Sequence, residues 1–448
     1  MVRQTLDVVR AFRFELDPSN QNKSRLLSHV GARRYAFNWG LSLVKMDLEN
    51  KKINKAHMSI GWSMPALRKR FNQDKEVVAP WWGENSKDAY ASGLGDLADA
   101  LAAWSASRRG LRKGARVGFP KYKKRGDRDS VRFSTGVLRV EDEHHVVLPR
   151  IGRLRTKEPM RELLKRLQAG DVRILSASAK QVAGRWHVSL ICAAKLWIPN
   201  LPQRKLAAGV DVGLKHLAII ADSEGTIEYV ENPRSLMKAQ TALRRTQRIL
   251  ARREVDSKRR EKAKQALARQ HARVTRQRLD ALHKLTHHLT HSYQSVVIEH
   301  LNVAGMMQNH HLARALSDAS FGEIRRQLTY KMLWAGGELL EADVFFPSSK
   351  RCHKCGTVKA KLSLSDRVFR CENLECLWSG DRDENAARNL LALVTQSALG
   401  TLNARGLGVR PSRAGQSRKA RNPWKKREAG SPSGHQTSSP TPQGVGVV

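Results

Sequence analysis

Three short acidic motifs stand far apart in a chain that is otherwise strongly basic. They are GVDVG at 209–213, VIEH at 297–300 and DRDENAA at 381–387. With a formal net charge of +40, the chain needs no extra anions for solubility, so Asp211, Glu299 and Asp383 call for another explanation. Carboxylate oxygens are the ligands that Mg²⁺ prefers, and bound Mg²⁺ acts on phosphate groups. The motifs therefore indicate divalent-metal chemistry on a phosphate substrate.

The three carboxylates lie at the ends of predicted elements. Asp211 follows an apolar strand, Glu299 ends a second apolar strand, and Asp383 starts a helix. Taken singly, Asp211 is more simply a turn former, Glu299 a strand-end charge and Asp383 an N-cap. Their joint placement favours convergence of two strand ends and one helix start. Asp381 is the possible substitute or outer group.

Three convergent carboxylates would bind two Mg²⁺ ions about 3.5 to 4 Å apart. Such a pair activates water and stabilises the leaving 3′-oxygen during in-line hydrolysis of a phosphodiester. This is ribonuclease H-like chemistry. We therefore expect Asp211, Glu299 and Asp383 to be both the catalytic residues and the magnesium ligands.

Four clustered cysteines predict a second metal site, which is structural. They are Cys352, Cys355, Cys371 and Cys376, in CHKCG and CENLEC. Two knuckle-like pairs separated by a hairpin-sized segment are typical of tetrahedral Zn²⁺, and four sulfur ligands leave no open position for catalysis. His353 is expected on the surface or behind the ligands, and Cys192, alone in an apolar run, in the core.

Composition bounds the class of protein. The 448 residues are enough for two or three folded units. The excess of 81 Lys+Arg over 41 Asp+Glu favours a polyanionic partner, above all nucleic acid. Because the chain lacks a run of about 20 apolar residues, we expect a soluble, cytoplasmic protein of the prokaryotic nucleoid, with no membrane partner.

Hydrophobic patterning predicts the elements that position the carboxylates. Strands are expected at 206–212, 217–221, 227–230, 295–299 and 341–346, and helices at 235–292, 321–337 and 384–394. The break at Asp256 and Ser257 divides the long helical run into a hairpin. The resulting order is βββ, α, β, α, β, α.

The first 204 residues have a different texture. Residues 20–110 show helical spacing with several tryptophans, which we interpret as core residues rather than base-stacking platforms. Short β-like runs between 131 and 193 suggest a small barrel. After about residue 398, a composition rich in Arg, Ser, Pro and Gly predicts a disordered basic tail.

Two basic clusters are candidate nucleic-acid contacts. They comprise Lys121, Lys123 and Lys124 around a tyrosine, and Arg244, Arg245, Arg248, Arg252 and Arg253 in the helical hairpin. The hairpin has far more basic than acidic residues, so internal ion pairs cannot balance its charge. This excess favours contact with a phosphate backbone. For the lysine cluster, a solvated loop is an equally good interpretation.

The motifs together resemble those of the transposon-encoded TnpB (OrfB) family. They are GVDVG at 209–213, EHLN at 299–302, FGEIR at 321–325, PSSKRCHKCG at 347–356 and DRDENAA at 381–387. RFELDP at 13–18 and YAFNW at 35–39 fit the opening of the family. One departure is visible, because the second cysteine pair is separated by four residues where the family usually has two.

The resemblance implies an RNA-guided DNA endonuclease related to type V CRISPR effectors. A guide RNA from the right end of the transposon would pair with double-stranded target DNA, and the protein would read only a short flanking motif. Asp211, Glu299 and Asp383 map onto the catalytic triad of the family, and the protein is expected to act as a monomer.

The implied fold is multidomain α+β, with a RuvC/RNase H-like nuclease domain, a zinc-finger insertion and a wedge-type β-barrel that carries a helical recognition insertion. The expected boundaries are 1–19 and 112–204 for the barrel, 20–111 for the helical module, 205–350 and 380–397 for the nuclease domain, 351–379 for the zinc finger and 398–448 for the tail.

Two other functions stay open from the sequence. A transposase in the strict sense would join DNA ends with the same fold, although no helix-turn-helix is evident in the sequence. A non-catalytic guided binder would need only the basic surface and the zinc module. The presence of all three acidic residues disfavours this last class.

Overall fold

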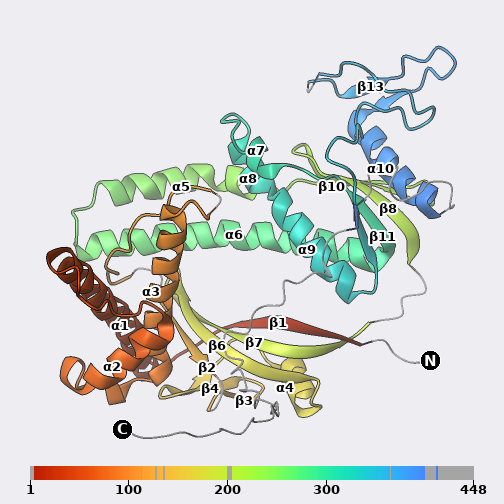
Figure 1. Cartoon of the computed structure of the whole chain (residues 1–448). Coiled ribbons are helices and arrows are strands. Elements are labelled where there is room, and N and C mark those ends of the chain that lie inside the picture. Colours follow the sequence, from red (N-terminus) through yellow and green to blue (C-terminus); the bar gives the residue numbers. More distant parts are fainter. Residues whose placement is uncertain are drawn as a thin grey trace, which may run out of the picture.

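The computed structural model describes residues 5–112, 114–126, 129–134, 137–198, 204–363, 365–398 and 410–411. The chain is multidomain and mixes helices with sheets, as predicted. Figure 1 shows an N-terminal lobe, coloured red to yellow, and a C-terminal lobe, coloured green to blue. We use these two names for residues 5–198 and 204–398. The lobes touch where the guanidinium of Arg10 lies 5.1 Å from the ring centre of Trp334.

Helices form the first half of the N-terminal lobe. They are α1 (Asn20–Ile53), α2 (Met64–Val78), the 3-10 turn η1 (Trp82–Glu84) and α3 (Lys87–Arg108). Each α-helix begins after a serine, Ser19, Ser63 or Ser86, whose hydroxyl accepts a backbone N–H. Helices α1 and α3 meet at Gly93, where a Cβ would lie 2.1 Å from the carbonyl oxygen of Arg33.

The tryptophans of this helical part pack mainly on its core, as predicted. Trp39, Trp62 and Trp82 lie against the buried cluster, and the ring of Trp104 meets that of Phe119 edge-on at 5.0 Å. Trp81 is the more exposed member, with 37% of its surface accessible. The aromatic spacing therefore reflects burial.

Two antiparallel sheets complete the N-terminal lobe. The first has the order β1 (Thr5–Glu15), β7 (Arg185–Trp197), β6 (Val172–Val182) and β2 (Ser130–Ser134). The second contains β3 (Arg139–Asp142), β4 (His145–Leu148) and β5 (Gly152–Arg155), followed by α4 (Arg161–Gln168). A single bridge between Leu16 and Thr156 connects them. Over the described residues, the predicted barrel is thus two open sheets.

A mixed sheet forms the centre of the C-terminal lobe. Its order is β10 (Ile227–Glu231), β9 (His216–Asp222), β8 (Lys205–Asp211), β11 (Tyr293–Ile298), β12 (Glu338–Glu341) and β15 (Arg410–Pro411). Strands β8 to β10 form an antiparallel meander, whereas β11 runs parallel to both β8 and β12. The predicted order βββ, α, β, α, β, α is found, except that the fifth strand lies at 338–341 and not at 341–346.

Helices cover both faces of this sheet. They are α5 (Ser235–Ala251), α6 (Lys258–Ser292), α7 (Val303–Met306), α8 (Ala313–Ala319), α9 (Phe321–Trp334) and α10 (Arg382–Ala398). Val296 and Ile298 of β11 join the core made with α6 and α9, while Val297 between them joins the core made with α10. Alternate residues of a strand point to opposite faces, which explains why β11 is apolar throughout.

The helical hairpin forms where it was predicted. Ser257 caps α6, since its hydroxyl accepts the N–H of Arg260 at 3.1 Å. The prediction of a fifth strand at 341–346 was wrong: β12 ends at Glu341, and Asp343 then opens a turn whose carbonyl accepts the N–H of Phe346 at 3.0 Å. The apolar residues 344–346 gave this turn the sequence pattern of a strand.

A small ribbon projects from the C-terminal lobe, next to α10 (Figure 1). We call residues 351–381 the cysteine ribbon; it contains the paired strands β13 (Val368–Arg370) and β14 (Ser379–Asp381). The predicted tail, 398–448, lies outside the described residues except for Ala398 and the two residues of β15. Among the helices of the described residues, none is long and apolar enough to cross a membrane.

Candidate functional site

Two of the predicted carboxylates stand at one edge of the central sheet. Asp211 is the last residue of β8, and Glu299 directly follows β11. In the parallel pairing of these strands Ile298 lies opposite Val210, so both acidic residues come at the carboxyl ends of neighbouring strands. This is the edge at which α/β sheets usually bind ligands.

Helix α10 packs closely against β8 because Gly209 has no side chain there. A Cβ on Gly209 would lie 2.2 Å from the carbonyl oxygen of Ala387 and 2.3 Å from the amide nitrogen of Leu391. The backbone of α10 therefore rests directly on β8, which only glycine allows. Asp383, one turn before Ala387, is carried to the edge where Asp211 ends its strand.

The charges of the three carboxylates act on one another. Burial raises the pKa of Asp211 well above its usual range, and the negative charges of Glu299 and Asp383 raise it further. Burial also raises the pKa of Glu299, against the opposing effects of a hydrogen bond from Ser348 and the charge of Arg382. A divalent cation would relieve this crowding of like charges, so the donor set fits a hard metal ion.

The carboxylates nevertheless do not form a closed cage. Of all groups of three or more potential ligands in the described residues, only the four cysteines have their ligand atoms within 4.8 Å of one another. The three carboxylates thus influence one another through their charges at an open edge of the sheet.

Asp381 and Asp383 differ in their surroundings. Asp381 caps α10, because its Oδ1 accepts the N–H of Asp383 at 2.8 Å and that of Glu384 at 3.1 Å. Asp383 instead lies close to two arginines, with its carboxylate oxygens 3.6 Å from Nε of Arg382 and 3.8 Å from Nη1 of Arg367. Capping therefore explains Asp381 without any metal.

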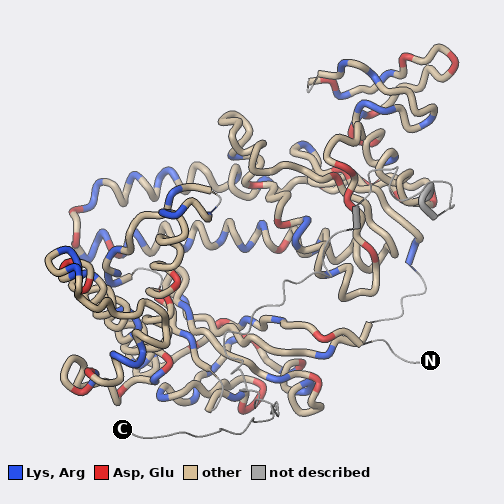
Figure 2. Tube along the Cα trace, viewed as in Figure 1, with Lys and Arg blue, Asp and Glu red and all other residues tan. Residues whose placement is uncertain are grey.

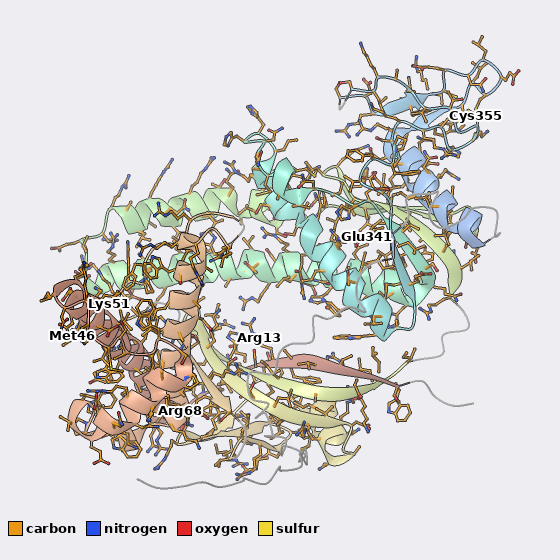
Figure 3. The ribbon with its side chains drawn as sticks, in the orientation of Figure 1. Arg13, Met46, Lys51, Arg68, Glu341 and Cys355 are labelled. Atoms are coloured by element: carbon orange, nitrogen blue, oxygen red, sulfur yellow. The ribbon has the colours of Figure 1, made fainter. Side chains whose placement is uncertain are left out.

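A fourth carboxylate lies beside the edge, and the sequence pattern did not predict it as a site residue. Glu341, the last residue of β12, is 5% exposed and accepts a hydrogen bond from Nε of Arg325 at 2.9 Å. Its other oxygen lies 2.7 Å from Nδ1 of His300, the residue after Glu299. Figure 3 labels Glu341 within the C-terminal lobe. His300 and Arg325 both lie in motifs named above, but only the structure shows that they share Glu341 as a partner.

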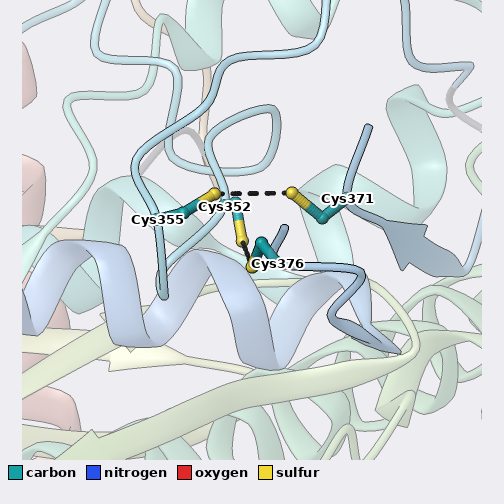
Figure 4. Close-up of side chains that lie close together, drawn as sticks. All are labelled: Cys352, Cys355, Cys371 and Cys376. Carbon is teal, nitrogen blue, oxygen red and sulfur yellow. Dashed lines mark hydrogen bonds between the residues drawn. The ribbon is translucent and has the colours of Figure 1, made fainter. Parts of the chain in front are cut away.

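The four cysteines come together in the ribbon. Sγ of Cys352 lies 3.8 Å from that of Cys376, and Sγ of Cys355 lies 3.4 Å from that of Cys371 (Figure 4). Four thiolates at about 2.3 Å from a tetrahedral Zn²⁺ would be separated by about 3.8 Å. All four cysteines are free of disulfides, so the donor set fits zinc.

The four residues between Cys371 and Cys376 form a turn that brings the two cysteines together. The N–H of Cys376 donates to the carbonyl of Asn373 at 3.1 Å, and Leu377 then takes a left-handed conformation with φ of 44°. In the first pair, hydrogen bonding with the side chain and the backbone of Thr357 lowers the pKa of Cys355 to about 6, which favours the thiolate that a metal requires.

The lysine cluster lies on an irregular segment beside the helices of the N-terminal lobe. A hollow of about 780 Å³ is lined there by residues of α1 and α3 and by Lys121 and Lys123. Lys121 and Lys124 are exposed, whereas Nζ of Lys123 donates to Asp96 at 2.8 Å and lies 4.0 Å from the ring centre of Phe37. Lys123 therefore has a structural partner.

The arginine cluster lies on the hairpin. Arg244, Arg245 and Arg248 are on α5, and Arg252 and Arg253 follow its end. All five are exposed, and Figure 2 shows the basic positions along this hairpin. None of these arginines belongs to the carboxylate edge, so they are candidates for a backbone contact remote from the chemistry.

Comparison with known proteins identifies the family. Three family models match: a probable transposase model of the OrfB/IS605 type over 187–310, a Cas12f1-like TNB domain over 321–390 and a helix-turn-helix domain over 8–52. The last description differs from the structure, in which residues 8–52 hold most of β1 and of the single uninterrupted helix α1.

Curated relatives extend the match to most of the chain. "Putative RNA-guided DNA endonuclease Rv2885c" of Mycobacterium tuberculosis is 39% identical over 404 residues, which cover 85% of this chain and 86% of the relative. "Putative RNA-guided DNA endonuclease InsQ" of Escherichia coli is 29% identical over 399 residues, covering 86% and 92%. The chain therefore belongs to the OrfB family of TnpB-like proteins.

Among solved structures, a Cas12f1 complex with sgRNA and target DNA aligns with a TM-score of 0.47 at 12% identity, over 86% of this chain and 98% of that chain.

Proposed function

We propose that this protein is an RNA-guided endonuclease that cuts double-stranded DNA, with Asp211, Glu299 and Asp383 as its catalytic residues. The observation that carries the proposal is the placement of Asp211 and Glu299 at the carboxyl ends of neighbouring strands, with Asp383 close enough for its charge to raise the pKa of Asp211, in a chain of net charge +40. The names of the full-length relatives support the guided activity. The zinc assigned to the cysteines has a structural role.

The topology supports a RuvC/RNase H-like nuclease domain. An antiparallel meander, β10-β9-β8, is extended by two parallel strands, β11 and β12, and α10 covers one face. We assign residues 205–350 and 380–397 to this domain. We assign the N-terminal sheets and helices to the wedge and recognition modules.

The carboxylates would hold two Mg²⁺ ions, which supply the activation of water and the stabilisation of the leaving 3′-oxygen. The residues of the chain prepare the site. Ser348 donates to Glu299 and favours its ionised form, and the charge of Arg382 favours ionisation of both Glu299 and Asp211.

The basic surface would hold the nucleic acids. The exposed arginines of the hairpin and the lysines near the hollow are proposed contacts to phosphates of the guide RNA and the target DNA. Base pairing with a guide from the right end of the transposon would read the target, next to a short flanking motif. One such site would cut both strands in turn.

The test is cleavage of a plasmid by protein purified with its own transposon-end RNA. The matched plasmid is expected to be cut in the presence of Mg²⁺, and Asp211→Ala is expected to abolish cutting. Asp280→Ala is the matched control, because Asp280 is an exposed residue of α6 paired only at the surface with Lys284. Equal cutting by Asp211→Ala and wild type would overturn the assignment.

Strand transfer is the competing activity, and the transposase description of the matching family model favours testing it. A donor and target DNA mixture would yield joined products from a transposase and only cut products from a guided nuclease. RNA that co-purifies should be sequenced, since ribosomal RNA alone would indicate nonspecific binding by charge.

A further inference from the structure

Two buried asparagines of α10 hold the first cysteine knuckle. Asn385 and Asn389, which are 0% and 3% exposed, lie one turn apart on the helix. The amide of Asn385 accepts the N–H of His353 at 3.0 Å and donates to the carbonyl of Arg351 at 2.6 Å. Asn389 donates to the carbonyls of Ser348 and Arg351 at 2.8 and 2.6 Å. The backbone of 348–353 is thereby fixed on α10.

This short segment joins the two metal sites. At one end, the buried Ser348 donates its hydroxyl to the carboxylate of Glu299. At the other end, Cys352 contributes its sulfur to the cysteine cluster, and its N–H donates to the carbonyl of Thr357 at 2.8 Å. Between them the N–H of Arg351 donates to the carbonyl of Pro347 at 2.9 Å, which makes the connection a compact turn.

The ribbon also reaches the third carboxylate. Val368 of β13 pairs with Asp381 of β14, and Asp381 caps the helix on which Asp383 stands. Arg367, just before β13, is within 3.8 Å of Asp383. The segment that enters the ribbon therefore contacts Glu299 through Ser348. The segment that leaves the ribbon reaches the surroundings of Asp383 through Asp381.

We propose that Asn385, Asn389 and Ser348 are positioning residues through which the zinc-loaded ribbon sets the orientation of Glu299 at the carboxylate site. The proposal rests on the proposed function, because it assumes that Glu299 holds a divalent cation. Residues behind a metal ligand typically change metal affinity by about 10- to 100-fold when they are lost.

The test measures Mn²⁺ binding by the full-length protein, from the electron paramagnetic resonance signal of free Mn²⁺. Asn389→Asp keeps the size of the side chain but removes both N–H donors, and it is expected to weaken Mn²⁺ binding by about tenfold. Zinc content, measured in parallel, is expected to stay at that of the wild type. Asn54→Asp is the matched control, since Asn54 lies outside both sites and uses its side-chain oxygen to accept the N–H of Ala56, and Asp retains that acceptor.

Ser348→Ala provides the second arm, because it removes only the hydroxyl and leaves the backbone contacts in place. It is expected to weaken Mn²⁺ binding to a similar extent, with Ser348→Thr restoring the affinity. Wild-type affinity in a folded, zinc-loaded Asn389→Asp protein would overturn the coupling while leaving the nuclease assignment intact. If the Asp211→Ala protein bound Mn²⁺ as tightly as the wild type does, the nuclease assignment and the coupling would both be overturned.

Discussion

At the scale of the residue, Gly209 decides how closely α10 approaches β8. Gly209→Ala would place a methyl group against the backbone of Ala387 and Leu391, and overpacking of this kind costs about 1 to 3 kcal/mol. We expect a lower melting temperature and impaired plasmid cleavage. Gly322→Ala on α9 is the control: a Cβ there meets nothing within 4 Å, so the helix should gain about 0.5 to 1 kcal/mol. Equal destabilisation by both changes would contradict the close contact.

The neighbouring aspartates of the DRDENAA motif should respond differently to the same change. Asn is as good an N-cap as Asp, so Asp381→Asn should retain the cap of α10 and most of the cleavage activity. Asp383→Asn removes a proposed metal ligand and should abolish cleavage. Both proteins are to be compared in the plasmid assay at saturating guide RNA. Loss of activity in Asp381→Asn alone would reverse the assignment.

Lys331 provides a prediction for alkaline pH. Burial between α9 and α6 lowers its pKa to about 8, although it donates to the Thr286 hydroxyl at 2.7 Å. The unfolded chain therefore binds more protons than the folded chain from about pH 8 up to the ordinary value of 10.5, and this residue makes stability rise with pH in that window.

Consequently, any stability advantage of Lys331→Met over the wild type should be larger at pH 7.5 than at pH 9.5, in paired urea unfolding curves. Lys284→Met, at an exposed position of α6, is the control for the loss of a lysine charge from the same part of the lobe. If the stability advantage of Lys331→Met over the wild type increased with pH, the predicted direction of the pH dependence would be wrong.

The candidate site divides into residues that the sequence reveals and residues that it hides. Asp211 and Glu299 could be proposed because each ends an apolar run, which is a local pattern. The contact of Ser348 with Glu299 spans 49 positions, and no periodicity in either segment predicts it. Glu341 was hidden because its strand was placed too late in the chain, so that the turn after it was taken for the strand.

At the scale of the element, the basic hairpin of α5 and α6 should bind nucleic acid through phosphates. Arg245→Gln combined with Arg248→Gln removes two exposed charges from α5. We expect weaker RNA binding in fluorescence anisotropy, and a salt dependence of log K that is shallower by about one to two units.

Lys51→Gln combined with Lys52→Gln, at the end of α1, removes the same charge from another exposed position and is the control. An equal change in the two double variants would mean that total charge, and not the hairpin, determines binding.

Elements were easier to predict than their closure into sheets. The hairpin was visible because residues 235–292 lack Pro and Gly and Ser257 offers a cap. The N-terminal strands were also visible, but whether they close into one barrel depends on edge pairing. The observed pairing connects strands as distant as β1 and β7, with Val8 opposite Ala194. Such register is set by packing across the sheet, which a local pattern does not contain.

At the scale of the whole molecule, the large positive charge coexists with a half-buried acidic site. Burial and the negative charges of Glu299 and Asp383 raise the pKa of Asp211, while the charge of Arg382 opposes that rise. The sequence predicted the excess of charge and the class of partner, since both follow from composition. It did not predict that α10 and the segment 348–353 would connect the carboxylate edge to the cysteine cluster.

The three proposed catalytic residues come from widely separated parts of the chain, and this has a consequence for biosynthesis. Translation produces β8 first, β11 later and α10 after the cysteine ribbon. A nascent or truncated polypeptide that stops before Asp383 therefore has the arginines of the hairpin and two of the three carboxylates. Such a fragment should bind nucleic acid without cutting it, so the order of synthesis delays nuclease activity until nearly the whole described chain exists.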